Sequence, residues 1–343
     1  MGPQNETKNP HEEMKDKIDN YIQTIQALIG FMNFYRYDDD KRITREDVII
    51  FQGWRLDHEI EPGSESAIQY VTPDLGILYA HEQGVLAEAK KSFPRNQENW
   101  SDDFKQLMAY DSDLLGWPCE GEKIAQHDIV LLLDQTRGAA IKIFYESKEG
   151  TEIKFKRPFI IIQFNRRVNR KHSIFFQIIK GSLSERKLSE RLIIGVPVPM
   201  DLFIDIYSEI KLYDDRPPLP YLIELIWTNI VLEKAVADPK FEKLKINSKI
   251  GVILDVDDIV QELNEGFTFR SVCKMDSVRQ QKIPRRAWVA DACEELVRIG
   301  EAEWIDSERK KVKIFFRKYH DVRDHFINAY LAQVEELKQP KLL

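Results

Sequence analysis

VTPDLGILYAHEQGVLAEAKKSFP occupies residues 71–94 and holds two mainly apolar runs joined by a polar connection that ends at Gly84. Alternating apolar runs with a glycine between them predict a tight β-hairpin. Each run carries one acid, Asp74 near the start of the first and Glu88 near the end of the second. Lys90 lies two residues beyond Glu88, so the strand period of two puts both side chains on one face. Two carboxylates and an ammonium group gathered there are costly unless a divalent cation binds between them.

An amphipathic helix is predicted after the hairpin, where residues 102–110 read DDFKQLMAY. Gln106 and Tyr110 are four residues apart and therefore share one face of this helix. Pro73-Asp74 and Glu88-Ala89-Lys90 resemble the two half-motifs of the PD-(D/E)xK nuclease superfamily. Gln106 and Tyr110 resemble the Gln-x-x-x-Tyr element of its RecB-like members. Glu-x-Lys recurs elsewhere in this charged chain, but here it follows an apolar run, and the only Pro-Asp pair of the sequence lies upstream.

This resemblance implies an α/β fold with a restriction-endonuclease-like core in the order αβββαβ. It also implies metal-dependent hydrolysis of phosphodiester bonds. Asp74, Glu88 and the backbone carbonyl of Ala89 would bind Mg²⁺ or Mn²⁺, which are hard cations suited to oxygen ligands. Members of the superfamily often add an acid from the segment before the Pro-Asp strand. The candidates here are Glu59, Glu61 and Glu65, of which Glu65 is closest to the motif.

The resemblance also gives roles to the other polar residues of the motif. Lys90 would orient the attacking water or stabilise charge on the scissile phosphate. Gln106 and Tyr110 would face the same cleft and contact the substrate strand or hold Lys90 in place.

A rival acidic pair lies further along the chain. Asp134 closes the apolar run DIVLLLD, and Glu146 follows the run IKIFY, which we interpret as a strand. We rank this pair lower because DIVLLLD lies where the next core strand of the fold is expected. The predicted elements around these runs are helices at 11–35 and 44–54 and strands at 128–134, 140–145, 159–164 and 173–179.

The composition bounds the class of protein. The chain has 343 residues, 43% of them hydrophobic and 31% charged, which is typical of a globular protein with two domains. No run reaches the roughly 18 apolar residues of a membrane span, so no membrane association is expected. Three cysteines without a CxxC spacing favour a reducing, cytoplasmic setting and argue against a zinc site. The net charge of −7 makes the local clustering of basic residues decisive for nucleic-acid binding.

The chain divides at the proline-rich segment 214–220. We predict a disordered tail at 1–10, a nuclease-like domain at 11–181, a connection at 182–216 and a mainly helical domain at 217–343. Helices at 221–236, 256–264 and 284–299 followed by strands at 302–305 and 311–316 resemble a winged helix-turn-helix. A final helix at 321–337 closes the chain, and a homodimer is one arrangement that it allows.

Basic residues cluster at two places that suit DNA phosphates. One is the loop between two predicted strands, with Arg166, Arg167, Arg170 and Lys171. The other is the start of the third helix and the wing of the second domain, with Arg285, Arg286, Arg309, Lys310 and Lys311. A solvated hairpin tip explains the first cluster equally well, and acids in the third helix leave a protein partner open for the second.

These observations predict a Mg²⁺-dependent DNA endonuclease with a winged helix for DNA or partner binding. Two alternatives remain: a RecB-like exonuclease, and a protein that keeps the nuclease fold for DNA binding or regulation without activity.

Overall fold

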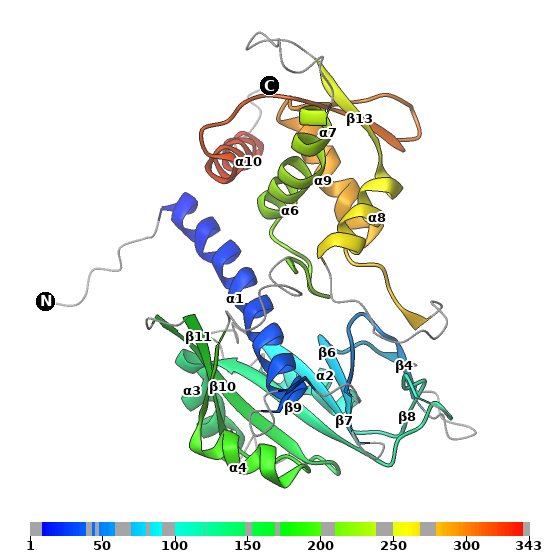
Figure 1. The fold of residues 1–343 in the computed structure, drawn as a ribbon. Coiled ribbons are helices and arrows are strands. Elements are labelled where there is room, and N and C mark those ends of the chain that lie inside the picture. The colour runs from blue at the N-terminus through cyan, green and yellow to red at the C-terminus, as the bar shows by residue number, and fades with distance from the viewer. Residues whose placement is uncertain are drawn as a thin grey trace, which may run out of the picture. The chain divides into compact units, whose positions relative to one another are not determined.

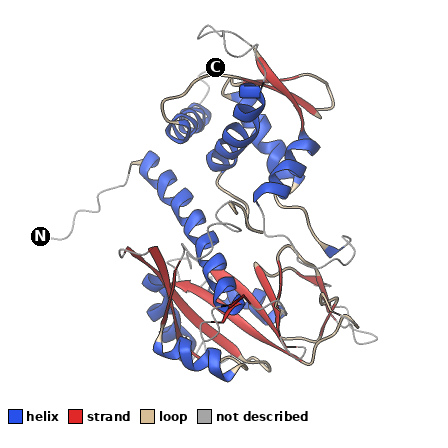
Figure 2. Cartoon of the chain, viewed as in Figure 1, coloured by secondary structure: helices blue, strands red, loops and turns tan. Residues whose placement is uncertain are grey.

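The computed structural model describes residues 9–38, 43–44, 48–58, 70–79, 83–90, 100–119, 121–147, 153–168, 172–199, 210–237, 250–267 and 279–338 (Figures 1 and 2). The protein is a mixed α/β protein. Its contacts divide it into an N-terminal unit, residues 23–214 with 269–281, and a C-terminal unit, residues 1–22 with 215–268 and 282–343. The division after residue 214 falls beside the proline-rich segment. The chain is not divided at one point alone. Residues 1–22 belong to the C-terminal unit, and residues 269–281 belong to the N-terminal unit.

The N-terminal unit is built on a mixed sheet. Among the described residues this sheet has seven strands in the order β12-β11-β10-β9-β7-β6-β3. The central strands β7, β9 and β10 are parallel, and the outer pairs are antiparallel. The bounds are β3 Ile49–Phe51, β6 Leu75–Tyr79, β7 Gln83–Lys90, β9 Gln126–Asp134, β10 Phe159–Val168, β11 His172–Lys180 and β12 Val196–Pro199.

Short strands form two further small sheets. They are β1 Tyr37–Asp38 with β2 Ile43–Thr44, and β5 Tyr70–Val71, β4 Leu56–His58 and β8 Leu114–Leu115 in the order β5-β4-β8. The predicted helix over residues 44–54 is therefore wrong. The run Val48–Phe51 is rich in β-branched residues and pairs with β6 instead. Phe51 packs directly on Gly76, where a Cβ atom would lie 2.0 Å from its ring.

The helices of the N-terminal unit are α1 Pro10–Arg36, α2 Trp100–Ala109, α3 Gln135–Glu146 and α4 Arg186–Ile194. Helix α1 begins in the C-terminal unit and continues into this one. Phe104 and Leu107 of α2 are fully buried in one core with Leu86 of β7 and Ile129 of β9. This packing places α2 over the face of β7 that carries Leu86 and, two residues on, Glu88, which explains the proximity of the predicted site residues.

The predicted strand over residues 140–145 is also wrong, because these residues form α3. The side chain of Asp134 accepts a hydrogen bond from the Thr136 amide at 2.9 Å and so caps the helix. Ile141 and Phe144 are three residues apart and reach the core, whereas Ile143 is 69% exposed. The apolar run thus follows a helical period rather than a strand period.

The C-terminal unit continues from α1 with helices and a small sheet. Its elements are α6 Leu219–Ile226, a π-helical turn Trp227–Val231, α7 Leu232–Ala237, β13 Gly251–Asp255, α8 Val256–Phe267, α9 Arg286–Arg298, β14 Ala302–Trp304, β15 Lys311–Phe315 and α10 Val322–Lys338. The strands pair antiparallel in the order β13-β15-β14. Strand β13 was not predicted. Helix α9 begins at Arg286, with Arg285 as its N-cap residue rather than within its first turn.

Within the ranges described above, no helix has the length and apolar character needed to cross a membrane.

Candidate active site

The β6–β7 hairpin brings Asp74 and Glu88 to the same end of two paired strands. Leu75 pairs with Ala87, so Asp74 lies level with Glu88 in the register. The Ala89 amide donates to Asp74 Oδ2 over 2.9 Å, which ties the two half-motifs together directly. Asp74 is 4% exposed and Glu88 is 1% exposed. Both acids are therefore buried at a strand end, where an unpaired carboxylate is costly.

Hydrogen bonds from three described residues converge on the Glu88 carboxylate. Tyr110 donates its hydroxyl to Oε2 at 2.7 Å, and Gln106 donates Nε2 to Oε1 at 2.8 Å. Lys90 Nζ lies 3.0 Å from the same Oε1 and also donates to Gln106 Oε1 over 3.0 Å. Gln106 thus joins Lys90 to Glu88, and the residues predicted from the two motifs form one hydrogen-bonded cluster. Charge-assisted bonds of this kind are shorter and stronger than neutral ones.

Burial and charge together keep Tyr110 protonated. Burial raises its pKa well above the usual value, and the negative charges of Glu88 and Asp74 raise it further. A protonated phenol can only donate to Glu88 at this geometry. Tyr110 therefore fixes one carboxylate oxygen of Glu88 at any pH near neutrality.

His127, which the sequence reasoning missed, supports the end of α2. It lies in β9 with 2% exposure, and its Nε2 donates to the Tyr110 carbonyl over 2.7 Å. Burial lowers its pKa to about 4, against smaller opposing effects that include this hydrogen bond. The imidazole is therefore neutral at physiological pH. No spacing in the sequence connects His127 to the motif, because the contact depends on how α2 returns to β9.

The donor set suits a hard divalent cation. Asp74, Glu88 and the Ala89 carbonyl offer oxygen atoms alone, which Mg²⁺ prefers. No group of three or more His, Cys, Asp or Glu side chains that could hold a metal occurs within the described ranges. The cluster contributes two carboxylates, and the candidates for a further acid, Glu59, Glu61 and Glu65, lie outside those ranges.

The rival acidic pair is not assembled. Asp134 caps α3 through Thr136, and Glu146 lies at the other end of that helix. Glu146 Oε1 is 3.9 Å from Lys180 Nζ, as in an ordinary surface ion pair. The two acids thus lie at opposite ends of α3, and each has a structural role there.

The basic residues of the C-terminal unit are mostly paired with acids. Arg286 is 2.8 Å from Asp257, and Arg309 is 2.9 Å from Glu294. Lys310 pairs with Glu308, and the guanidinium of Arg285 lies 5.3 Å from the Trp288 ring centroid. Lys311 begins β15 and is exposed. In the predicted basic loop, Arg166 and Arg167 lie in β10, their side chains are not described, and Arg170 and Lys171 lie outside the described residues.

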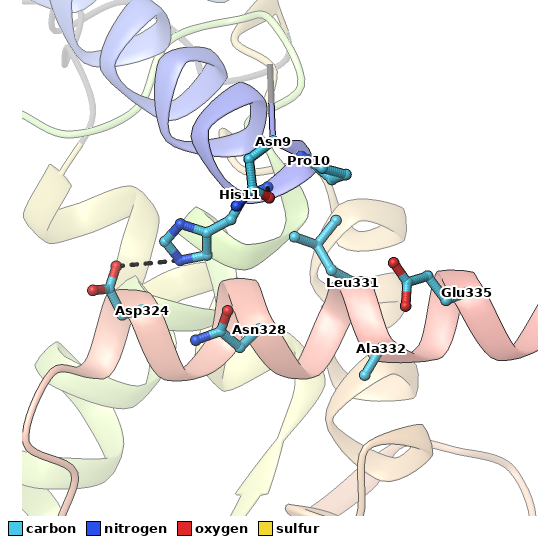
Figure 3. Close-up of a pocket in the computed structure, with 8 residues that line it drawn as sticks. All are labelled: Asn9, Pro10, His11, Asp324, Asn328, Leu331, Ala332 and Glu335. Atoms are coloured by element: carbon cyan, nitrogen blue, oxygen red, sulfur yellow. Dashed lines mark hydrogen bonds and ion pairs between the residues drawn. The ribbon is translucent and has the colours of Figure 1, made fainter. Parts of the chain in front are cut away.

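A surface cavity of about 460 Å³ lies in the C-terminal unit (Figure 3). It is lined by the start of α1 and one side of α10, where His11 Nε2 lies 3.6 Å from Asp324 Oδ1. The lining contains no residue of the predicted site. This cavity therefore does not bear on the cluster around Glu88.

No protein-family model, curated protein or solved structure matches the chain. Its function is therefore inferred from the arrangement of its own residues.

Proposed function

We propose that this protein is a Mg²⁺-dependent nuclease that hydrolyses phosphodiester bonds in DNA. The observation that carries the proposal is the convergence of Lys90, Gln106 and Tyr110 on the buried carboxylate of Glu88, beside Asp74. These side chains come from two separate elements, β7 and α2. A buried acid with a lysine, an amide and a phenol around it is an expensive arrangement for stability alone.

The order of elements supports the same proposal. Helix α1 is followed by the antiparallel strands β3, β6 and β7, then by α2 and by β9, which is parallel to β7. With the short strands β1, β2, β4, β5 and β8 left aside, this order supports the αβββαβ core that the PD-(D/E)xK resemblance implies. Fold order alone does not establish an activity, so the weight rests on the side chains.

Each residue has a distinct role in the proposed reaction. A bound Mg²⁺ would supply charge neutralisation at the phosphate and a more acidic water. Asp74, Glu88 and the Ala89 carbonyl would hold that ion. Lys90 would stabilise negative charge on the phosphate or orient the attacking water, and Gln106 would fix its ammonium group. Tyr110 would hold Glu88 in the orientation that the ion requires.

The C-terminal unit would deliver the nuclease to its substrate. The order α6, β13, α8, α9, β14, β15 supports a winged helix, in which α9 would approach DNA and the β14–β15 hairpin would be the wing. The ion pairs of Arg286 and Arg309 do not prevent this, because exposed pairs contribute about 1 kcal/mol or less and can exchange for phosphates. Asp291 and Glu294 on α9 oppose close phosphate contact, which keeps a protein partner as the second candidate.

Substitution of the acids tests the proposal. Asp74→Ala and Glu88→Ala should abolish cleavage of plasmid DNA in Mg²⁺, while circular dichroism shows a retained fold. Asp134→Ala is the matched control. It also removes an acid at the end of a strand, but this acid caps helix α3 and is not part of the cluster. Cleavage by the wild-type protein in EDTA would refute the assignment. Cleavage at the wild-type rate by either acid variant would refute it as well.

A further inference from the structure

Residues 279–281, here called the strap, belong to the N-terminal unit although the chain runs from them into α9 of the other unit. Their backbone pairs with the segment between β3 and β4. Arg55 N donates to Arg279 O over 2.8 Å, and Gln281 N donates to Gly53 O over 2.7 Å. Trp54 and Gln280 form an antiparallel bridge between these bonds. Figure 1 shows this late segment of the chain beside β4.

The side chain of Arg279 anchors the strap. Its Nη1 donates to Asp57 Oδ2 at 2.6 Å, and its Nη2 donates to Glu122 Oε2 at 3.1 Å. Burial alone would raise the pKa of Asp57, but hydrogen bonds and charge from Arg55 and Arg279 outweigh it and lower that pKa below its usual value. The guanidinium therefore bridges two acids, and its charge helps to keep Asp57 ionised at neutral pH.

The guanidinium also lies on Gly116, so the local backbone is shaped to receive it. A Cβ atom at Gly116 would lie 2.3 Å from Arg279 Nη1, and the residue has a φ of +86° that favours glycine. The Gly116 carbonyl accepts a 2.7 Å hydrogen bond from Trp54 Nε1. The fit indicates a specific seat for Arg279 rather than a casual surface ion pair.

The strap brackets the strand that carries Asp74. On one side it holds Gly53, and Phe51 just before it packs on Gly76 of β6. On the other side Gln281 Nε2 reaches Thr72 Oγ1 at 3.5 Å, two residues before Asp74. Residues 279–281 thus contact the chain just before Asp74 directly, and they contact the segment that packs on β6 just after it.

We propose that the strap positions Asp74 for metal binding and that Arg279 is its anchoring residue. This inference rests on the proposed nuclease function, because it gives the strap a role in that site. Arg279 touches neither Asp74 nor Glu88 through any bond described here, so it is a positioning residue. A shift of Asp74 by a fraction of an ångström would spoil the ligand geometry that Mg²⁺ requires.

The experiment uses the full-length protein as wild type, Arg279→Ala, Arg279→Lys and Gln281→Ala. Arg186→Ala is the control, because it removes an exposed ion pair between Arg186 and Glu190 within α4 of the same unit. Hydrogen–deuterium exchange is measured for residues 70–79, Mg²⁺ binding by calorimetry without DNA, and cleavage as kcat and KM.

Arg279→Ala should speed exchange in residues 70–79 by tenfold or more, weaken Mg²⁺ binding by threefold or more and lower kcat, with KM for DNA unchanged. Arg279→Lys should restore only part of each effect, since an ammonium group cannot bridge two carboxylates as a guanidinium does. Gln281→Ala should give a smaller change of the same kind, and it keeps the test valid if Arg279→Ala does not fold. Arg186→Ala should match the wild type.

Unchanged exchange in residues 70–79 would overturn the inference. Faster exchange with wild-type Mg²⁺ affinity and kcat would also overturn it, since the strap would then be structural only. If the wild type neither binds Mg²⁺ nor cleaves DNA, the nuclease proposal fails by itself. The exchange data would still show whether the strap holds the strand of Asp74.

Discussion

Replacing Tyr110 by phenylalanine tests whether its hydroxyl holds Glu88 in place. The hydroxyl donates to Glu88 Oε2 over 2.7 Å, and both residues are 1% exposed. The substitution removes one oxygen atom and keeps the ring, so it creates almost no cavity. The measured change in stability therefore reports the loss of one hydrogen bond to a buried carboxylate.

The size of the effect follows from the charge and burial of the acceptor. A hydrogen bond to a charged group contributes about 1.5–3 kcal/mol, compared with about 1 kcal/mol for a neutral pair. We expect the free energy of unfolding of Tyr110→Phe to fall by about 1.5–3 kcal/mol without metal. Mg²⁺ should widen the difference, because the variant, in which Glu88 loses the donor that orients it, binds the ion more weakly and gains less stability from it.

Urea denaturation followed by circular dichroism measures this difference. Tyr79→Phe is the matched control, because Tyr79 is 5% exposed on neighbouring strand β6 and its hydroxyl has no hydrogen-bond partner among the described residues. Removing such a hydroxyl should change the free energy of unfolding by less than about 0.5 kcal/mol, or raise it. If Tyr110→Phe costs no more than Tyr79→Phe, Tyr110 does not hold Glu88, and the proposed site geometry is refuted.

Three further predictions concern pH, substrate form and DNA affinity. The pKa of His127 is about 4 in the folded protein and about 6.5 in the unfolded chain, so the unfolded chain takes up a proton first as the pH falls. The free energy of unfolding should therefore drop by about 3 kcal/mol between pH 6.5 and pH 4. Urea denaturation at a series of pH values measures this drop, which should be much smaller in His127→Gln. An endonuclease should nick or linearise covalently closed circular DNA on a gel, whereas survival of circles while linear DNA of the same sequence is degraded would favour the exonuclease. Arg285→Ala with Arg286→Ala in the full-length protein should weaken duplex binding tenfold or more in fluorescence anisotropy, taking about 1–3 kcal/mol per good contact. Alanine substitution of Arg309, Lys310 and Lys311 should lower the slope of log affinity against log salt by about one unit per lost phosphate contact. If neither the Arg285 and Arg286 variant nor this variant changes the affinity for duplex DNA at low salt, the C-terminal unit binds a protein partner instead.

The α/β class and the hairpin were predictable because both depend on local pattern. The two apolar runs on either side of a polar segment specify β6 and β7, although both strands are buried almost throughout and Gly84 lies within β7, paired with Leu78. The four-residue spacing of Gln106 and Tyr110 predicted that both face the same side, and the structure places Gln106 in α2 and Tyr110 directly after its last residue, Ala109. The cluster around Glu88 was therefore accessible from sequence, whereas its proposed chemistry stays a prediction.

The errors arose where a short apolar run fits either period. Residues 140–145 read as a strand, but Asp134 and Thr136 form a helix cap that outweighs the β-branched content. Residues 48–51 read as a helix, yet the contact of Phe51 with Gly76 depends on a partner strand that the local pattern does not reveal. The contacts of His127 and Arg279 were not predicted for the same reason, since each residue contacts neighbours distant in sequence.

The exchange of segments between the two units affects how the protein responds to cleavage of its backbone. A protease that cut once near Arg216 would leave a C-terminal fragment that still carries residues 269–281, and an N-terminal fragment that still carries residues 1–22. Each fragment would keep a piece of the other's fold. The C-terminal fragment carries Arg279, which binds Asp57 of the N-terminal fragment, and the N-terminal fragment carries Lys15, whose Nζ lies 2.7 Å from Asp324 of the C-terminal fragment. The nicked protein should therefore elute from a sizing column as one species. Its two fragments should separate only under denaturing conditions.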